Sequence, residues 1–189
     1  FLPLWTTEFI SSKIQYVSEH YLLYNFIDGG IKTTIFISYI AIIGTIPSFK
    51  RVFQYHGAEH KSIYTYEKKL PLEVENAKDQ TRFHPRCGTS FVIIVFAISI
   101  FVYSLVPRHE VFILHFLRRV AFLPLVAGIA YEALKLSAKN IDSKWVRILI
   151  TPGLWFQRLT TKEPNDKQIE VGLVALQSAL KLEGEIATN

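Results

Sequence analysis

An unbroken run of 21 uncharged residues, from Cys87 to Pro107, is the strongest constraint on how this chain folds. A transmembrane α-helix needs about 20 consecutive apolar residues, because that length crosses the hydrocarbon core of a bilayer. A second run, Thr33 to Phe49, carries no charge over 17 residues. Ile31 and Lys32 extend it, since a lysine side chain can reach toward the headgroups. The two runs predict spanning helices over 87–107 and 31–49.

A third apolar segment, 111–131, is long enough to span a bilayer but contains Arg118 and Arg119. A charge near the bilayer centre costs at least about 2.5–3.5 kcal/mol, so these arginines must face protein or water, or the span must be short. Pro124 predicts a kink in this helix. Half of the residues (50%) are apolar, which excludes a disordered chain. We therefore predict an all-α, multi-pass helical membrane protein that forms a single membrane domain over 1–189.

The other segments are predicted to lie outside the three spans. Residues 1–27 mix aromatic and charged side chains, which favours an interfacial N-terminal helix. Residues 145–160 are too few to cross and contain Pro152-Gly153, which favours an interfacial or re-entrant helix. Residues 167–185 have apolar side chains at helical spacing and predict an amphipathic helix that packs on a partner or caps the protein.

The distribution of Lys and Arg explains the net charge of +5. Basic residues concentrate in the expected loop 50–86, whereas the link after the span 87–107 offers only Arg108. By the positive-inside rule, the loop faces the cytoplasmic side of a bacterial cytoplasmic membrane, or the equivalent side of a plastid membrane. Nucleic-acid binding loses its main support, and the lipid bilayer becomes the expected partner. Because the chain starts at Phe1 and lacks methionine, we expect it to be a trimmed or processed product.

His56-Gly57-Ala58-Glu59-His60 forms an H-x-x-E-H pattern, the reverse of the H-E-x-x-H zinc signature. Residues four apart share one face of a helix, so His56 and His60 can bind one ion while Glu59 acts on a bound water as general base. The alternative is a pair of interfacial histidines that follow a spanning helix.

His84 and Cys87 stand three apart, where the loop meets the second span, and are further candidate metal ligands. The alternative for Cys87 is a small buried side chain in a turn that caps the helix. Glu132 follows the third span and is expected at the same membrane face, where it can supply a ligand or a base. Its alternative is an interfacial acid that pairs with Lys135.

Four stretches of the chain, in order, resemble the YqhQ-like family, catalogued as domain of unknown function 1385. They are RVFQYHGAEHK (51–61), HPRCGTSF (84–91), LPLVAGIAYE (123–132) and PGLWFQRLTT (152–161) followed by Glu163-Pro164. The family is described as predicted metal-dependent integral membrane proteins. The resemblance implies functional roles for His56, Glu59, His60, His84, Cys87 and Glu132. It also covers Asp28, where the family usually has Glu.

Two functions follow from these patterns. In the first, the protein is a membrane hydrolase with a divalent metal ion bound at His56, His60 and one of His84, Cys87 or Glu132. The ligand types indicate zinc, and Glu59 is the general base. In the second, the same residues hold the expected loop 50–86 in a fixed conformation. The protein is then a scaffold or assembly partner of other integral membrane proteins or of itself. A transporter is a weaker third interpretation, because three short spans make a poor pathway.

Overall fold

The computed structural model describes residues 2–106, 111–140 and 143–187, and these residues form helices without a β-strand. The predicted all-α fold is therefore confirmed. Where the sequence predicted one membrane domain, the chain divides into two compact units. Unit 1 is Phe1–Tyr39 with Arg86–Gly153, and unit 2 is Ile40–Pro85 with Leu154–Asn189. Phe1, Pro107, Arg108 and Asn189, which enter the predictions above, lie outside the described residues.

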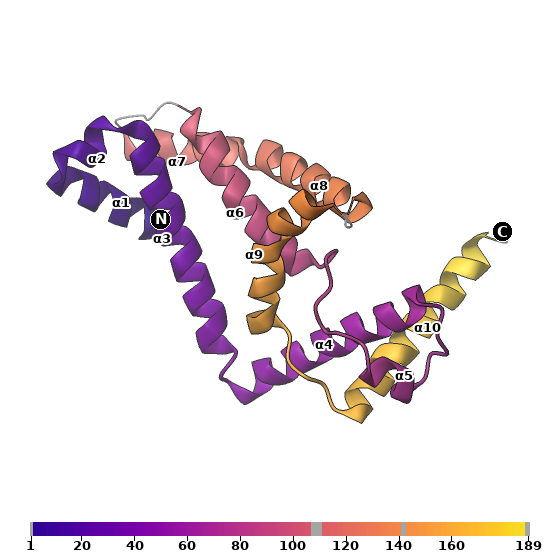
Figure 1. The fold of residues 1–189 in the computed structure, drawn as a ribbon. Coiled ribbons are helices and arrows are strands. Elements are labelled where there is room, and N and C mark those ends of the chain that lie inside the picture. The colour runs from indigo at the N-terminus through magenta and orange to yellow at the C-terminus, as the bar shows by residue number, and fades with distance from the viewer. Residues whose placement is uncertain (1, 107–110, 141–142, 188–189) are drawn as a thin grey trace. The chain divides into compact units, whose positions relative to one another are not determined.

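Unit 1 holds the helices at the start and in the middle of the chain (Figure 1). They are α1 (Leu2–Lys13), α2 (Gln15–Glu19), most of α3 (Tyr21–Ile43), α6 (Gly88–Ser104), α7 (Phe112–Ala121), α8 (Leu123–Lys139) and the first part of α9 (Lys144–Thr160). Helix α8 packs against α6 and α7. The core of this packing contains Val102, Tyr103 and Val126.

Two helical segments of the described chain are long and apolar enough to cross a membrane. They are Leu22–Ile43, with 22 residues, and Phe112–Ser137, with 26. Only 11% and 17% of their apolar windows are buried, whereas the core helix of a soluble protein is mostly buried. Helix α6 is apolar but has 17 residues, about 26 Å of helix, which is the lower limit for a span. These features are consistent with a helical membrane protein.

The first apolar helix does not match the predicted span 31–49. Helix α3 starts at Tyr21 and ends at Ile43, because a turn leads there into Pro47, the first residue of α4. Proline suits the first turn of a helix, where its missing N–H has no bond to make. The predicted N-terminal segment 1–27 is correspondingly divided among α1, α2 and the start of α3.

The apolar segment 111–131 bends as predicted. Helices α7 and α8 are separate and meet at Phe122, two residues before Pro124. Residues 145–160 form one continuous helix, α9, with Pro152 inside it.

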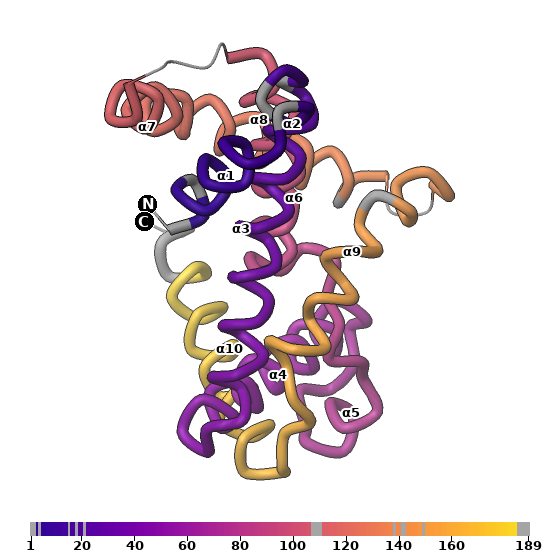
Figure 2. Tube along the Cα trace, turned by 90° about the vertical axis from the view of Figure 1, so that its left-hand side faces the viewer, coloured from indigo at the N-terminus to yellow at the C-terminus, as the bar shows by residue number. Residues whose placement is uncertain are grey.

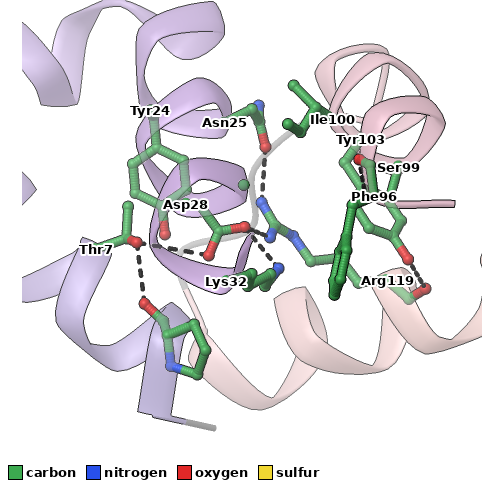
Figure 3. Close-up of polar contacts among 12 residues, drawn as sticks. Thr7, Tyr24, Asn25, Asp28, Lys32, Phe96, Ser99, Ile100, Tyr103 and Arg119 are labelled. Atoms are coloured by element: carbon green, nitrogen blue, oxygen red, sulfur yellow. Dashed lines mark hydrogen bonds and ion pairs between the residues drawn. The ribbon is translucent and has the colours of Figure 1, made fainter. Parts of the chain in front are cut away.

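In unit 1 the side chain of Arg119 faces other protein groups, which is one of the arrangements predicted for an arginine in this apolar segment. The buried Arg119 guanidinium donates hydrogen bonds to the carboxylate of Asp28 and to Oδ1 of Asn25, the latter at 2.7 Å, and both acceptors lie on α3 (Figure 3). Lys32 Nζ also contacts Asp28, at 2.7 Å. Arg118, by contrast, is exposed. A buried ion pair therefore joins the two apolar segments of unit 1.

Unit 2 corrects the expectation of a long loop over 50–86. This region contains α4 (Pro47–Glu67) and α5 (Val74–Lys78), and α10 (Asp166–Ala187) lies along both of them (Figures 1 and 2). The many basic side chains obscured an amphipathic helix, since Ala58, Ala77, Ile169 and Leu173 form a common core. The predicted amphipathic helix 167–185 is thus present, and it packs on α4.

Local backbone interactions explain where these helices begin and end. Helix α4 ends in a Schellman motif, in which Lys69 adopts φ 56° and the N–H of Leu70 bonds to the carbonyl of Thr65 at 3.0 Å. Helix α10 begins with a capping box, since Asn165 and Gln168 each accept the other's backbone N–H, at 2.9 and 3.0 Å. The capping box fixes the backbone at Asn165, where the segment between α9 and α10 ends.

Lys78 at the end of α5 pairs with Asp166 at the start of α10, with Nζ and Oδ2 2.7 Å apart. This hydrogen bond raises the pKa of Lys78 above its ordinary value. A raised pKa contributes stability that is complete below the ordinary pKa of lysine and is lost as pH rises through the raised value. Both side chains are exposed, so the contribution is small.

Gly57 lies where the chain passes closest to α4. A Cβ at this position would overlap the backbone oxygen of Lys162, in the segment between α9 and α10. The N–H of Lys162 donates to the carbonyl of Phe53 at 2.8 Å, which holds this segment against α4. The glycine in the H-x-x-E-H pattern is therefore required by a close backbone approach.

We expect Gly57→Ala to destabilise unit 2 by about 1–3 kcal/mol, because the new methyl group forces the Lys162 backbone away. The control is Gly184→Ala on α10, where an added Cβ meets nothing within 4 Å. There alanine is expected to be neutral or to stabilise by up to about 1 kcal/mol through helix propensity. Unfolding midpoints in detergent measure both changes, and equal effects of the two substitutions would contradict the close approach.

Candidate functional site

One face of α4 carries a row of polar side chains. His56, His60, Tyr64 and Glu67 are spaced by four, four and three residues, and this spacing places them along one stripe of a helix. The His56 and His60 rings meet edge to face, with centroids 4.4 Å apart. His60 is buried and His56 is half-buried. The structure therefore brings together the two histidines of the motif as predicted.

Both histidines of the motif are oriented by backbone carbonyls. Nδ1 of His56 lies 2.8 Å from the carbonyl oxygen of Thr160, and Nδ1 of His60 lies 2.6 Å from that of Arg82. A carbonyl only accepts, so the hydrogen of each neutral ring is on Nδ1 and the lone pair is on Nε2. Metal-binding histidines are commonly oriented in this way, with one ring nitrogen donating to a carbonyl or carboxylate.

His84 joins these rings from the segment between α5 and α6. Its ring centroid lies 5.7 Å from that of His60 and 4.8 Å from that of Tyr64. Its Nε2 is 3.5 Å from the carboxylate of Glu67. Three imidazoles and one carboxylate thus gather on one side of α4.

The backbone of His84 is held by the fully buried Gln157 of α9. The amide oxygen of Gln157 accepts the N–H of His84 at 2.8 Å, and its amide nitrogen donates to the carbonyl of His84 at 2.7 Å. This pair of bonds replaces the strand or helix partner that the irregular segment lacks. The position of His84 is therefore set through its main chain.

The donor set fits a divalent metal of the zinc class. Zinc in proteins is held mostly by imidazole, thiolate and carboxylate groups in sets of three or four. A ring nitrogen of His56 lies within 4.8 Å of one of His60. His84 and its carboxylate neighbour Glu67 extend the set within the same unit. His56 and His60 are thus the residues of this unit whose ring nitrogens lie close enough to share such an ion, and His84 is a further imidazole beside them.

Glu59 lies apart from these rings. Its side chain is exposed and lines a cavity of about 380 Å³ between α4 and α10, together with Tyr55, Val171 and Gly172. The carboxylate that contacts a histidine is Glu67. Glu59 remains a predicted base, placed beside a cavity on the turn that also carries His60.

Cys87 and Glu132 belong to unit 1. Cys87 is buried at the N-terminus of α6, where its Sγ accepts the N–H of Thr89 at 3.4 Å. Glu132 is exposed on α8, with its carboxylate 3.9 Å from Nζ of Lys135. Their roles as metal ligands stay predictions.

A family model described as "Protein of unknown function (DUF1385)" matches residues 1–182. The chain belongs to this family. It is also similar to "Uncharacterized protein YqhQ" of Bacillus subtilis (strain 168), with 45% identity over 157 residues. The match covers 83% of this chain and 49% of that protein, so the chain spans about half the length of its curated relative. No solved structure matches the chain.

The site of this DUF1385 chain includes residues that the sequence did not single out. Glu163 is one of them, since its carboxylate contacts the buried ammonium of Lys61 at 2.6 Å and lies 3.7 Å from Nε of Arg82. Arg82 also donates to the carbonyl of Thr161. Tyr64 donates to the carbonyl of Phe83 at 3.0 Å. The spacing of His56, His60, Tyr64 and Glu67 along one face of a helix is the sequence feature that could have indicated Tyr64 and Glu67.

We expect Gln157→Leu to destabilise this DUF1385 chain by about 2–4 kcal/mol, because it leaves a buried N–H and a buried carbonyl of His84 unsatisfied. Gln177→Leu, at an exposed position of α10, is the matched control and should change stability by less than about 0.5 kcal/mol. Denaturant unfolding in detergent measures both variants. A Gln157→Leu protein as stable as the control would show that the two bonds do not hold His84.

Proposed function

We propose that this chain is a membrane protein whose unit 2 binds a divalent metal ion at His56, His60 and His84. Zinc is the ion that we propose. The carrying observation is the orientation of the first two rings, whose Nδ1 atoms both donate to backbone carbonyls. In that arrangement the lone pair of each ring is on Nε2, the atom that would bind the ion, and the two rings are one turn apart on α4. His84 supplies a third imidazole of the same unit.

The metal is proposed to hold irregular backbone in place. The segments 79–87 and 161–165 lie outside the helices, and their carbonyls, like those of the last turn of α9, need partners. Side chains of α4 supply these partners through His56, His60 and Tyr64. An ion shared by His60 and His84 would tie segment 79–87 to α4 more strongly, since metal binding adds directly to folding stability. Such a unit serves as a docking platform for other membrane proteins or for a second copy.

A metal-dependent hydrolase is the second candidate. The exposed carboxylate of Glu59 beside a cavity of about 380 Å³ is the observation that favours it. A bound zinc ion would supply a water of lowered pKa and a Lewis acid for a carbonyl or phosphoryl oxygen. Glu59 would then hold the proton taken from that water, and the cavity would admit the substrate.

The proposed location is a bacterial cytoplasmic or plastid membrane, with the metal site on the cytoplasmic or equivalent face. The apolar segments Leu22–Ile43 and Phe112–Ser137 support insertion, since little of each window is buried. Unit 2 carries Lys50, Arg51, Lys61, Lys68, Lys69, Lys78 and Arg82 directly after the first of them. Such clusters favour the positive-inside side.

The first prediction from this proposal is about one zinc ion per chain in detergent-purified protein, measured by mass spectrometry. His56→Ala/His60→Ala should lose most of it, because two of three imidazole ligands are removed. His20→Ala is the control, since His20 is exposed in unit 1 and its ring contacts the carbonyl of Tyr16. A chelator should also lower the unfolding temperature of the unmodified protein, a measurement that does not depend on the variants. Metal-free protein with zinc present throughout purification would exclude the site.

Substitution of Glu59 distinguishes a structural role of the metal from a role in hydrolysis. Under the structural role, Glu59→Gln keeps both zinc and stability, whereas His60→Ala lowers the unfolding temperature. Under the hydrolase role, Glu59→Gln keeps zinc but abolishes the function that the gene provides in cells, because the base is lost. Full function with retained zinc in Glu59→Gln would remove the hydrolase from consideration. A His60→Ala protein as stable as the unmodified chain would contradict the structural role.

A further inference from the structure

Unit 2 contains a cavity of about 360 Å³ between the N-terminal half of α4 and the start of α10. The polar and aromatic side chains in its wall are Arg51, Gln54 and Tyr55 of α4 with Asn165, Lys167 and Gln168 at the start of α10. Two cationic side chains from different helices therefore reach one cavity, together with three amides.

Neither cation has an ion-pair partner in the part of the chain that the structure describes. The contact of Arg51 is with the ring of Tyr55, whose centroid lies 5.8 Å from Arg51 Cζ. That contact orients the guanidinium and does not use its N–H groups as hydrogen-bond donors. Lys167 is exposed on the first turn of α10. Both side chains can therefore donate to an anionic ligand.

The carboxylates that lie near these cations along the chain do not line the cavity. Asp166 and Glu163 form the ion pairs with lysines described above. Glu170, three residues after Lys167, is not among the lining residues. Glu59 lines the cavity of about 380 Å³ described above and does not line this one. Of the described residues in this wall, two are thus cationic and none is acidic.

The amides add N–H donors that are held in place by a chain of hydrogen bonds. Gln168 is buried, and its Oε1 accepts the backbone N–H of Asn165 at 2.9 Å, while its Nε2 donates to Oε1 of Gln54 at 3.2 Å. Nε2 of Gln54 donates in turn to the carbonyl of Glu163 at 3.2 Å. Each amide nitrogen carries two hydrogens, and these contacts use one of them. A second N–H of Gln54 and of Gln168 is thus available to a ligand with acceptor oxygens.

The cavity lies close in the chain to the end of the first apolar segment. That segment ends at Ile43, and Pro47, which also lines the cavity, follows four residues later. Four residues span at most about 14 Å, so chain connectivity alone keeps Pro47 near the end of the segment. In a chain inserted through Leu22–Ile43, the polar headgroup layer begins at that end. A lipid phosphate is therefore within reach of the cavity.

We propose that this cavity binds a phosphate group, which accepts charge-assisted hydrogen bonds from Arg51 and Lys167 and neutral ones from Gln54 and Gln168. A phosphate offers negative charge and several acceptor oxygens, which complement a wall that has donors and no carboxylate. Lipid headgroups and soluble phosphate esters share this chemistry. The place of the cavity after the apolar segment favours the headgroup of an anionic lipid, since Lys and Arg next to a spanning helix attract such lipids. The phosphate site is independent of the metal site, and only its lipid source rests on the proposed membrane location.

The test is the unfolding temperature of the detergent-purified chain at constant ionic strength, titrated with dioleoyl phosphatidylglycerol, with dioleoylglycerol or with inorganic phosphate. Dioleoylglycerol has the same acyl chains as the phospholipid but no phosphate. We expect phosphatidylglycerol to raise the unfolding temperature and dioleoylglycerol to leave it unchanged. Arg51→Gln and Lys167→Gln should each raise the concentration for half of the effect about tenfold, the factor that corresponds to one charge-assisted hydrogen bond.

Lys50→Gln is the matched control for Arg51→Gln, because it removes the neighbouring exposed charge of α4 and Lys50 does not line the cavity. It should change the concentration for half of the effect by less than about twofold, since an exposed charge outside the cavity is screened. Equal losses in Lys50→Gln and Arg51→Gln would overturn the site. Equal effects of phosphatidylglycerol and dioleoylglycerol, or no effect of either phosphate compound, would also overturn it.

The same titrations distinguish the two sources of the phosphate. Phosphatidylglycerol that acts at lower concentration than inorganic phosphate supports the lipid, whereas the reverse order overturns the lipid source and keeps the phosphate site. His56→Ala/His60→Ala should retain the response, because it removes metal ligands and leaves the cavity wall unchanged. A response lost in that variant would place the phosphate on a bound metal ion and overturn the cavity. Resistance of the chain to extraction from membranes by alkaline carbonate is measured separately, so a failure of the membrane location is distinguished from a failure of the phosphate site.

Discussion

The buried ion pair between Arg119 and Asp28 is the interaction on which the organisation of unit 1 depends. Without it, an arginine in the middle of an apolar segment would have neither water nor a counter-charge, and α7 could not take its place among apolar helices. With it, α3 and α7 are joined at a defined register, although 91 residues separate the two side chains in the sequence. Breaking such a pair from one side is costly because an unpaired charge remains buried. The same pair brings Lys32 and Tyr103 together.

Unit 2 solves a different problem, which is how to bury irregular backbone. Carbonyls of segment 79–87 and of the last turn of α9 lack a helix partner, and side chains of α4 supply one instead. The histidines of the H-x-x-E-H pattern are therefore fixed by the fold before any ligand is considered. This pre-orientation is what a metal site requires and is also sufficient for a purely structural hydrogen-bond network. Zinc content is the quantity that separates the two.

The sequence predicted the features that depend on local pattern. The all-α fold, the break next to Pro124, the amphipathic C-terminal helix and the proximity of His56 to His60 follow from hydropathy and helical spacing. The predicted loop over 50–86 was wrong, because α4 is amphipathic with polar and small residues on its buried face, as Ala58 and Ser62 show. Long-range partners could not be predicted: nothing near His84 indicates Gln157, 73 residues away, and nothing near Arg119 selects Asp28 over other acids. Glu163 was missed because a charged residue beside Pro164 is typical of a solvated turn.

The double hydrogen bond between Gln157 and the main chain of His84 has a consequence for local unfolding. Segment 79–85 is attached to the rest of unit 2 through Gln157, Tyr64, His60 and Thr161, and these contacts all fall on the neighbouring residues 82–84. Such a stretch opens cooperatively, since losing one contact frees the backbone that the others hold. Amide protons of 79–85 that are protected should therefore exchange together and not one by one. The site in unit 2 would then be assembled or dismantled as a whole, and the lifetime of the closed state would set how long any ligand of His84 is retained.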